Sequence, residues 1–305
     1  MKRYDATKPR HLPRFRLIEP HVMRTRDESV GYFRNSLNLT KTLPFIEKYN
    51  RDHNFDKDTR LTLFHIILCA TARTFALYPH LNRFISGRKY WQHNRLQFSF
   101  VVKKKLKAYA KETFAKIDFD PFDTLEIVRK RVHAFIYEAR SDKGNETEKE
   151  IDDWGKYPRW LLMLATKLFR TLEFFGKPIK SLTKPDPLYC SVIFANLGSV
   201  GLPAPYHHIF EWGNASWFIT VGKIYKKPVV NEAGEIVAQD TVDLGITLDE
   251  RISEGLYYAL GLKAITDFIE NPEKLISPPE IPEENLLELA LLDREKRLGK
   301  WDKFM

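Results

Sequence analysis

The chain is poor in cysteine, with only Cys69 and Cys190 among its 305 residues. The two lie far apart in the sequence, and each has apolar neighbours. This pattern excludes a disulfide framework, and it does not match the ligand spacing of a zinc site. We expect both cysteines to be buried in the core, and we expect no metal.

Long apolar runs are missing as well. None approaches the roughly 20 residues that a membrane-spanning helix needs. Residues 1–24 are basic and interrupted by prolines, and they lack the apolar segment of a secretory signal. The common motifs for phosphate-binding loops, dinucleotide binding, zinc proteases and serine hydrolases are also absent. These absences predict a cytoplasmic protein without a transmembrane segment.

The composition is that of a globular protein with a basic excess. Hydrophobic residues make up 43% and charged residues 29% of the chain, and 49 Lys and Arg outnumber 40 Asp and Glu. A net charge of +9 suits anionic partners such as phosphates, CoA, nucleic acid or acidic lipids, without selecting one.

Two basic stretches have competing interpretations. We expect residues 101–111 to be a solvated strand end; a nucleic-acid patch and a contact with the phosphates of CoA are the alternatives. Residues 159–184 predict a helix packed on the sheet or on a partner subunit, with binding to a membrane surface as the alternative. Nucleic acid is not expected as a partner.

Hydrophobic periodicity predicts an α/β fold. Strand patterns and helix patterns mix along the whole chain, without a convincing domain boundary, which indicates a single domain with a mixed sheet and flanking helices. We expect His65, on the apolar side of the first long helix, to be a core histidine. The expected helices are 41–50, 58–79, 120–140, 157–177 and 255–270, and the expected strands are 31–40, 96–104, 112–119, 188–198, 215–225, a hairpin over 226–239, and 241–248.

Three segments are expected in order. Residues 1–24 form a basic N-terminal arm, and 25–276 form the folded domain. Residues 277–305 contain a proline-rich break and then an amphipathic helix.

One stretch, "TLDERISEGLYYALG" at 247–261, combines a strand end, an acidic turn and a helix start. Together with the helix end "ENPEKL", it resembles the active-site segment of the chloramphenicol acetyltransferase-like fold. It is most similar to the catalytic domain of the acyltransferase components of 2-oxo-acid dehydrogenase complexes, the dihydrolipoamide acyltransferase family, whose motif is DHRxxDG.

Three further segments resemble that family in the same order. "YPHLNRFISGRKYW" at 78–91 is similar to its P-x-x-N segment, "FANLGSVG" at 194–201 to its strand motif TISNLGxxG, and "ASWFITVG" at 215–222 to its strand AILGVG. The resemblance covers about residues 25–275 and implies the same fold.

The resemblance implies acyl transfer from a thioester of CoA or of a lipoyl arm to a thiol or hydroxyl acceptor. In the family a His is the base, a Ser hydroxyl binds the oxyanion, an Asp orients the turn, and a trimer shares each site between neighbouring subunits. In this chain Glu250 stands at the His position, Glu254 at the Asp position and Ala195 at the hydroxyl position. The family pattern is retained at four candidate binding or backbone positions, Asn196, Gly198, Arg251 and Gly255.

These replacements weaken the expected chemistry. An unperturbed glutamate has a pKa about two units below that of histidine, so it is the weaker base near neutral pH. Loss of an oxyanion donor costs roughly 3–4 kcal/mol of transition-state stabilisation in comparable sites. The alternative interpretation of the two glutamates is a helix start that favours acids, with Arg251 as a salt-bridge partner.

Two neighbouring histidines offer a replacement base. His207 and His208 lie in "PAPYHHIFEWG" at 203–213, next to the strand motif, with Glu211 or Glu250 as the orienting carboxylate. The alternative is that both are surface or interface histidines.

Two hypotheses for the function therefore remain. The first is an acyltransferase that uses Glu250 with His207 or His208, and the second is a catalytically silent trimer of the same fold that binds or scaffolds. A nucleic-acid or membrane binder is a weaker third. We expect a homotrimer with no covalently bound cofactor, which takes its acyl group from a CoA thioester or a separate lipoyl-type carrier, because only a short arm precedes the folded domain.

Overall fold

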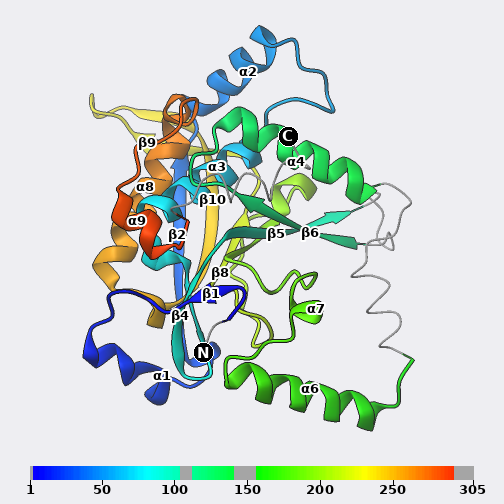
Figure 1. Cartoon of the computed structure of the whole chain (residues 1–305). Coiled ribbons are helices and arrows are strands. Elements are labelled where there is room, and N and C mark those ends of the chain that lie inside the picture. Colours follow the sequence, from blue (N-terminus) through cyan, green and yellow to red (C-terminus); the bar gives the residue numbers. More distant parts are fainter. Residues whose placement is uncertain (1–2, 104–111, 141–155, 292–305) are drawn as a thin grey trace.

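The predicted class and the single domain are confirmed by the arrangement of the elements. A computed structural model of the chain describes residues 3–103, 112–140 and 156–291. Its main sheet has seven strands in the order β2-β10-β8-β7-β5-β6, with β9 paired to one end of β10 (Figure 1). β7 is parallel to β5 and β8, and the other pairs are antiparallel. These strands are β2 (Val30–Asn38), β5 (Leu96–Lys103), β6 (Glu112–Phe119), β7 (Val192–Asn196), β8 (Trp217–Val221), β9 (Tyr225–Val230) and β10 (Ile236–Asp249).

A second, three-stranded sheet was not predicted. It consists of β1 (Ala6–Thr7), β4 (Lys89–His93) and β3 (Arg83–Ser86), in that order. Gly87 and Arg88 form the two-residue turn between β3 and β4, with φ angles of 61° and 57°. Two consecutive positive φ values are the hallmark of the hairpin turn that matches strand twist. β1 ties the N-terminal residues to this sheet.

The helices are α1 (Glu19–Val22), α2 (Thr42–Asp52), α3 (Leu63–Leu77), α4 (Leu125–Arg140), α6 (Arg159–Phe174), α7 (Lys180–Thr183), α8 (Gly255–Glu270) and α9 (Glu283–Glu288). α3 packs against α4 and α8, and these helices lie together on one side of the sheet (Figure 1). α6 lies at the opposite end of the molecule from α2.

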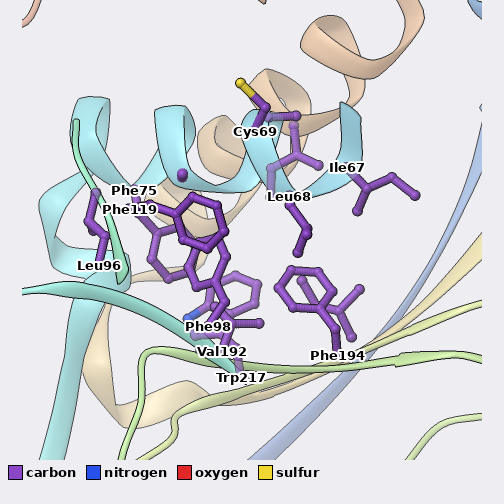
Figure 2. Close-up of a cluster of buried hydrophobic side chains, with 14 of the residues drawn as sticks. Ile67, Leu68, Cys69, Phe75, Leu96, Phe98, Phe119, Val192, Phe194 and Trp217 are labelled. Carbon is purple, nitrogen blue, oxygen red and sulfur yellow. The ribbon is translucent and has the colours of Figure 1, made fainter. Parts of the chain in front are cut away.

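The main core lies between α3 and the sheet. Figure 2 shows Leu68 and Phe75 of α3 above Phe98, Phe194 and Trp217 of the strands. All five side chains are buried, and Phe75 lies at a tilted angle to Trp217, with ring centroids 5.4 Å apart. Burying large aromatic side chains stabilises a fold by roughly 1.5–3 kcal/mol each. α3 is therefore the central helix of the domain.

α3 begins five residues later than predicted, because Thr62 is its N-cap. The Thr62 side chain and the His65 ring form a reciprocal capping box, in which the Thr62 amide donates to His65 Nδ1 at 3.0 Å. His65 is 3% exposed, so its prediction as a core histidine is confirmed. Cys69 and Cys190 are buried and free, also as predicted.

The two faces of the sheet have different roles. On β8, Trp217, Ile219 and Val221 belong to the core under α3, whereas Phe218 belongs to a smaller cluster on the other face. Because side chains alternate along a strand, Ala195 and Asp249 lie on the same face as Phe218. That face carries Ala195 and Asp249, whereas Leu248, which lines the hollow beside Glu250, belongs to the core side under α3.

The C-terminal part differs from the expected helix. α9 has six residues, and residues 292–305 of the predicted amphipathic helix lie outside the described residues. On α8 the buried side is formed by Tyr258, Gly261, Ile265 and Ile269. The described helices include none that is long and apolar enough to cross a membrane.

Candidate active site

The acidic turn after β10 is fixed by an ion pair. Asp249 accepts two hydrogen bonds from the Arg251 guanidinium, from Nε at 2.8 Å and from Nη2 at 2.7 Å, and both side chains are buried. The Asp249 carboxylate also accepts from the Arg251 amide at 3.2 Å. Arg251 was predicted as a possible partner of the two glutamates, but its guanidinium turns to Asp249 instead.

Three more side chains hold the same turn. The Arg251 carbonyl oxygen accepts from Arg16 Nη1 at 3.0 Å and from the Tyr90 hydroxyl at 2.9 Å. The Tyr258 hydroxyl donates to the Asp249 carbonyl oxygen at 2.6 Å. Sequence reasoning did not single out these three side chains. Arg16 and Tyr90 belong to distant elements that only the fold brings together, whereas Tyr258 lies within the quoted stretch 247–261.

Glu250 and Glu254 lie beside a hollow of about 380 Å³. Both are exposed, and the Glu254 carboxylate is 3.9 Å from Arg16 Nη2. Half-exposed Phe15 and Phe33 form part of the lining. The two candidate carboxylates thus share one cleft, with an arginine and apolar rings around them.

The two candidate histidines do not line this hollow. The His207 ring stacks on Phe218 with centroids 4.0 Å apart, and its Nδ1 lies 2.8 Å from the His208 carbonyl oxygen. His208 is exposed. Within the described chain, the structure therefore does not join His207 or His208 to Glu250 in one pocket.

Glu211 is engaged elsewhere. One of its carboxylate oxygens accepts from the backbone amides of Arg26 and Asp27, at 2.5 and 3.3 Å. It is therefore already committed as an acceptor, and its expected role as the orienting carboxylate of a histidine does not fit this arrangement.

The strand motif at the end of β7 offers no replacement for the missing hydroxyl. Ala195 packs against the small apolar cluster around Phe218. Ser199 Oγ donates to the Asn196 carbonyl oxygen at 2.7 Å, and Ser191 Oγ accepts from the backbone amide of Gln97 at 3.2 Å.

Gly198 and Gly255, the two motif glycines, differ in whether the surrounding structure leaves room for a side chain. A Cβ on Gly198 would lie 2.3 Å from the Gly222 carbonyl oxygen, so only glycine fits where the two backbones cross. A Cβ on Gly255 would meet open space. Gly255 is therefore not required for packing within the described part of one subunit.

The two thiols are not suited to nucleophilic chemistry. Burial raises the pKa of Cys69 to about 12 and that of Cys190 to about 11, so both stay protonated near neutral pH. The described residues also contain no group of three or more His, Cys, Asp or Glu side chains arranged to hold a metal ion.

Comparisons with known proteins show which family and which solved structures the chain resembles. Residues 192–277 match the sequence profile of the 2-oxoacid dehydrogenases acyltransferase (catalytic domain) family. This segment contains the strand motif, the two histidines and the acidic turn. The match confirms the predicted resemblance to this family over residues 192–277, and the solved structures below confirm the predicted fold. A comparison with curated protein sequences gives no match.

Solved structures agree in fold over most of the chain. A probable dihydrolipoamide acetyltransferase from Listeria monocytogenes is 16% identical, with a TM-score of 0.54, and the match covers 87% of this chain and 95% of that one. The dihydrolipoamide acetyltransferase of Azotobacter vinelandii is 14% identical, with a TM-score of 0.57 and coverage of 87% and 93%. A catalytic core of the 2-oxoacid dehydrogenase complex from Thermoplasma acidophilum is 11% identical, with a TM-score of 0.53 and coverage of 87% and 99%.

Proposed function

We propose that the protein is an acyltransferase that moves an acyl group from a thioester, carried by CoA or a lipoyl-type carrier, to a thiol or hydroxyl acceptor. The observation that carries the proposal is the position of Glu250. It follows the last strand of an acyltransferase fold, on a turn held by buried contacts, and its side chain opens into a cleft.

Glu250 acts as the general base in this proposal. Its carboxylate takes the proton of the acceptor thiol or hydroxyl, and the acceptor sulfur or oxygen attacks the thioester carbonyl carbon. The tetrahedral intermediate collapses, the carbon–sulfur bond breaks, and the carrier thiolate takes the proton back from Glu250. Proton transfer by a positioned base is typically worth about 10²–10⁴-fold in rate.

The surroundings of Glu250 match parts of this task. Phe15 and Phe33 supply apolar surface for an acyl chain or a carrier arm, and Arg16 supplies a positive charge near Glu254. Asp249 and Arg251 keep the turn rigid, which holds the base in place.

We further propose a homotrimer in which a neighbouring subunit closes the cleft. Phe15 and Phe33 are 57% and 41% exposed in one subunit, so a second copy would bury apolar surface there. The 203–213 segment of that copy would then bring His207 or His208 toward Glu250. This arrangement follows the resemblance and accounts for a cleft that holds only part of a catalytic set.

The second candidate is a catalytically silent member of the fold that binds a thioester or its carrier. Ala195 favours it, because its methyl group packs in an apolar cluster where acyl transfer needs a hydrogen-bond donor. The intact Asp249–Arg251 pair does not decide between the two, since it serves a rigid binding turn equally well.

A thiol-release assay across acyl-CoA donors tests the proposal. We expect turnover by the wild type and a loss of about 100-fold or more in kcat for Glu250→Gln, with the fold retained because Glu250 is exposed. His208→Ala tests the second residue. Glu47→Gln on α2 is the matched control, an exposed glutamate outside the cleft, and should leave turnover unchanged.

Each outcome decides between the candidates. Saturable binding of an acyl-CoA without thiol release would support the silent binder. Clear wild-type turnover that survives Glu250→Gln would overturn the role of Glu250 as base.

A further inference from the structure

A second hollow on the molecule is lined by arginines. It has a volume of about 310 Å³ and lies between the N-terminal residues, the β3–β4 turn and α6. We call it the arginine hollow. Its charged lining comprises five arginines and two glutamates, an excess of three positive charges: Arg24, Arg26, Arg88, Arg170 and Arg251, with Glu173 and Glu211.

Arg26 is the buried floor of the arginine hollow. It is 6% exposed, and its guanidinium donates to backbone carbonyl oxygens, including those of Glu211 at 3.1 Å and Gly213 at 2.9 Å. Its Nε has no hydrogen-bond partner among the described residues. The described carboxylates act on the Arg26 guanidinium without a direct hydrogen bond to it, and burial lowers the pKa of Arg26 in spite of them. A buried cation with an unused donor is costly, and an anion bound beside it would reduce the cost.

The two glutamates do not neutralise this floor by direct contact. One oxygen of Glu211 is held by the backbone amides of Arg26 and Asp27. Glu173 Oε2 accepts from the Tyr189 hydroxyl at 3.0 Å, and its Oε1 forms an ion pair with Arg3 Nη2 at 3.6 Å. Both glutamates are therefore engaged elsewhere, and the hollow keeps one unused donor, on Arg26.

Arg88 stands at the rim in a costly backbone conformation. Its φ of 57° lies in the left-handed region, where a residue with a side chain is less stable than glycine by roughly 1–2 kcal/mol. Its neighbour Gly87 cannot be replaced, because a Cβ there would run into the Phe174 carbonyl oxygen. The turn therefore holds the exposed Arg88 at the rim, where glycine or asparagine would be the more stable choice.

We infer that the arginine hollow binds a phosphate group, either free or carried by a nucleotide-type molecule. The Arg26 Nε and the rim arginines donate to its oxygens. The excess of three positive charges in the lining suits a phosphate, which carries up to two negative charges, better than a singly charged carboxylate.

This site is separate from the cleft beside Glu250. Arg251 lines the arginine hollow and Met23 lines the cleft, and Arg251 Nη1 donates to the Met23 carbonyl oxygen at 2.8 Å. That contact forms part of the wall between them. The phosphate site therefore does not rest on the proposed acyl transfer, and binding can be measured without turnover.

Calorimetry and thermal unfolding with inorganic phosphate test the inference, with chloride at equal ionic strength as the reference. We expect saturable binding and a rise in Tm beyond that in chloride. Arg88→Gly combined with Arg170→Gln removes two rim charges, and the first change also relieves the left-handed backbone, so folding should be maintained. We expect the Kd for phosphate to rise at least about tenfold in this variant.

Arg51→Gln on α2 is the matched control, since it removes one exposed arginine away from the hollow and should leave the Kd unchanged. Titrations with AMP and with acetate show which kind of anion the hollow prefers. Tighter binding of AMP than of phosphate indicates a nucleotide-type ligand, and equal or weaker binding indicates the free anion. The inference is overturned if phosphate and AMP neither bind saturably nor raise the Tm beyond its value in chloride. It is also overturned if acetate binds as tightly as phosphate, or if the double variant binds phosphate with the Kd of the wild type.

Discussion

Asp249 and Arg251, two residues apart at the end of β10, form a two-pronged ion pair that is almost fully buried, with side-chain exposures of 0% and 2%. We expect Arg251→Met to reduce the free energy of unfolding by about 3–5 kcal/mol, because the Asp249 carboxylate would stay buried without its partner. Chemical denaturation of the two proteins measures this difference.

The control for that prediction is an exposed pair that links β9 to β10. Lys226 Nζ lies 2.7 Å from Asp240, but the two side chains are 65% and 32% exposed. Lys226→Met should therefore change the free energy of unfolding by less than about 1 kcal/mol. Equal effects of the two substitutions would show that the buried pair does not stabilise the turn as described.

The two motif glycines should respond differently to alanine. Gly198→Ala places a methyl group 2.3 Å from the Gly222 carbonyl oxygen, and a backbone atom cannot move aside as a side chain can. We expect a loss of about 1–3 kcal/mol in the free energy of unfolding. Gly255→Ala meets open space and should leave the stability of the subunit unchanged, as measured by Tm. A lower Tm for Gly255→Ala than for Gly198→Ala would contradict this.

Stability should fall in acid partly because of His65. Burial lowers the pKa of His65 from 6.5 to about 3. Above pH 6.5 the imidazole is neutral in both states, whereas below it the unfolded chain binds a proton that the folded chain excludes until about pH 3. Between pH 7 and pH 5, we expect the free energy of unfolding to fall by about 2 kcal/mol less in His65→Gln than in the wild type.

Glutamine suits this test because it can keep the capping box with Thr62. Denaturant titrations at the two pH values give the result, and His11→Gln, which removes an exposed imidazole, serves as the control. Parallel pH profiles for the wild type and His65→Gln would mean that His65 is protonated in the folded protein.

The proposed trimer predicts an interface near the cleft. Leu256 follows Gly255 on α8 and is 74% exposed. We expect light scattering to give three times the mass of one chain for the wild type, and Leu256→Asp to shift it toward the monomer. Ile236→Asp, at the opposite end of β10 and 78% exposed, is the control. A wild-type protein that remains monomeric at high concentration would contradict this prediction.

The order of the main elements could be predicted because their patterns are local. The hairpin of β9 and β10 follows from alternating residues around Gly234, and β2, β5 and β6 follow from dense β-branched and aromatic runs. The hairpin of β3 and β4 was not predicted, because Gly87 and Arg88 lie in a segment that had been compared only with a family motif. β10 is also longer than expected, one strand of 14 residues where two shorter ones were predicted.

The candidate site was predictable only in part. Glu250 and Glu254 were found because they stand together in the sequence, and they do share a cleft. The support of the turn by Arg16 and Tyr90 joins residues more than 150 positions from Arg251, which no local pattern contains. Arg26 was hidden for a similar reason: among the many basic residues of the N-terminal region, nothing marks the one that the fold buries.

The position of β2 at the edge of the main sheet bears on how the chain is made. Among the residues that the structure describes, β2 (Val30–Asn38) pairs in that sheet only with β10 (Ile236–Asp249), about two hundred residues later. During synthesis the ribosome releases β2 long before β10 exists, so β2 stays unpaired while about two hundred further residues emerge. We therefore expect productive folding to be completed after translation, with chaperones protecting the early segments from aggregation.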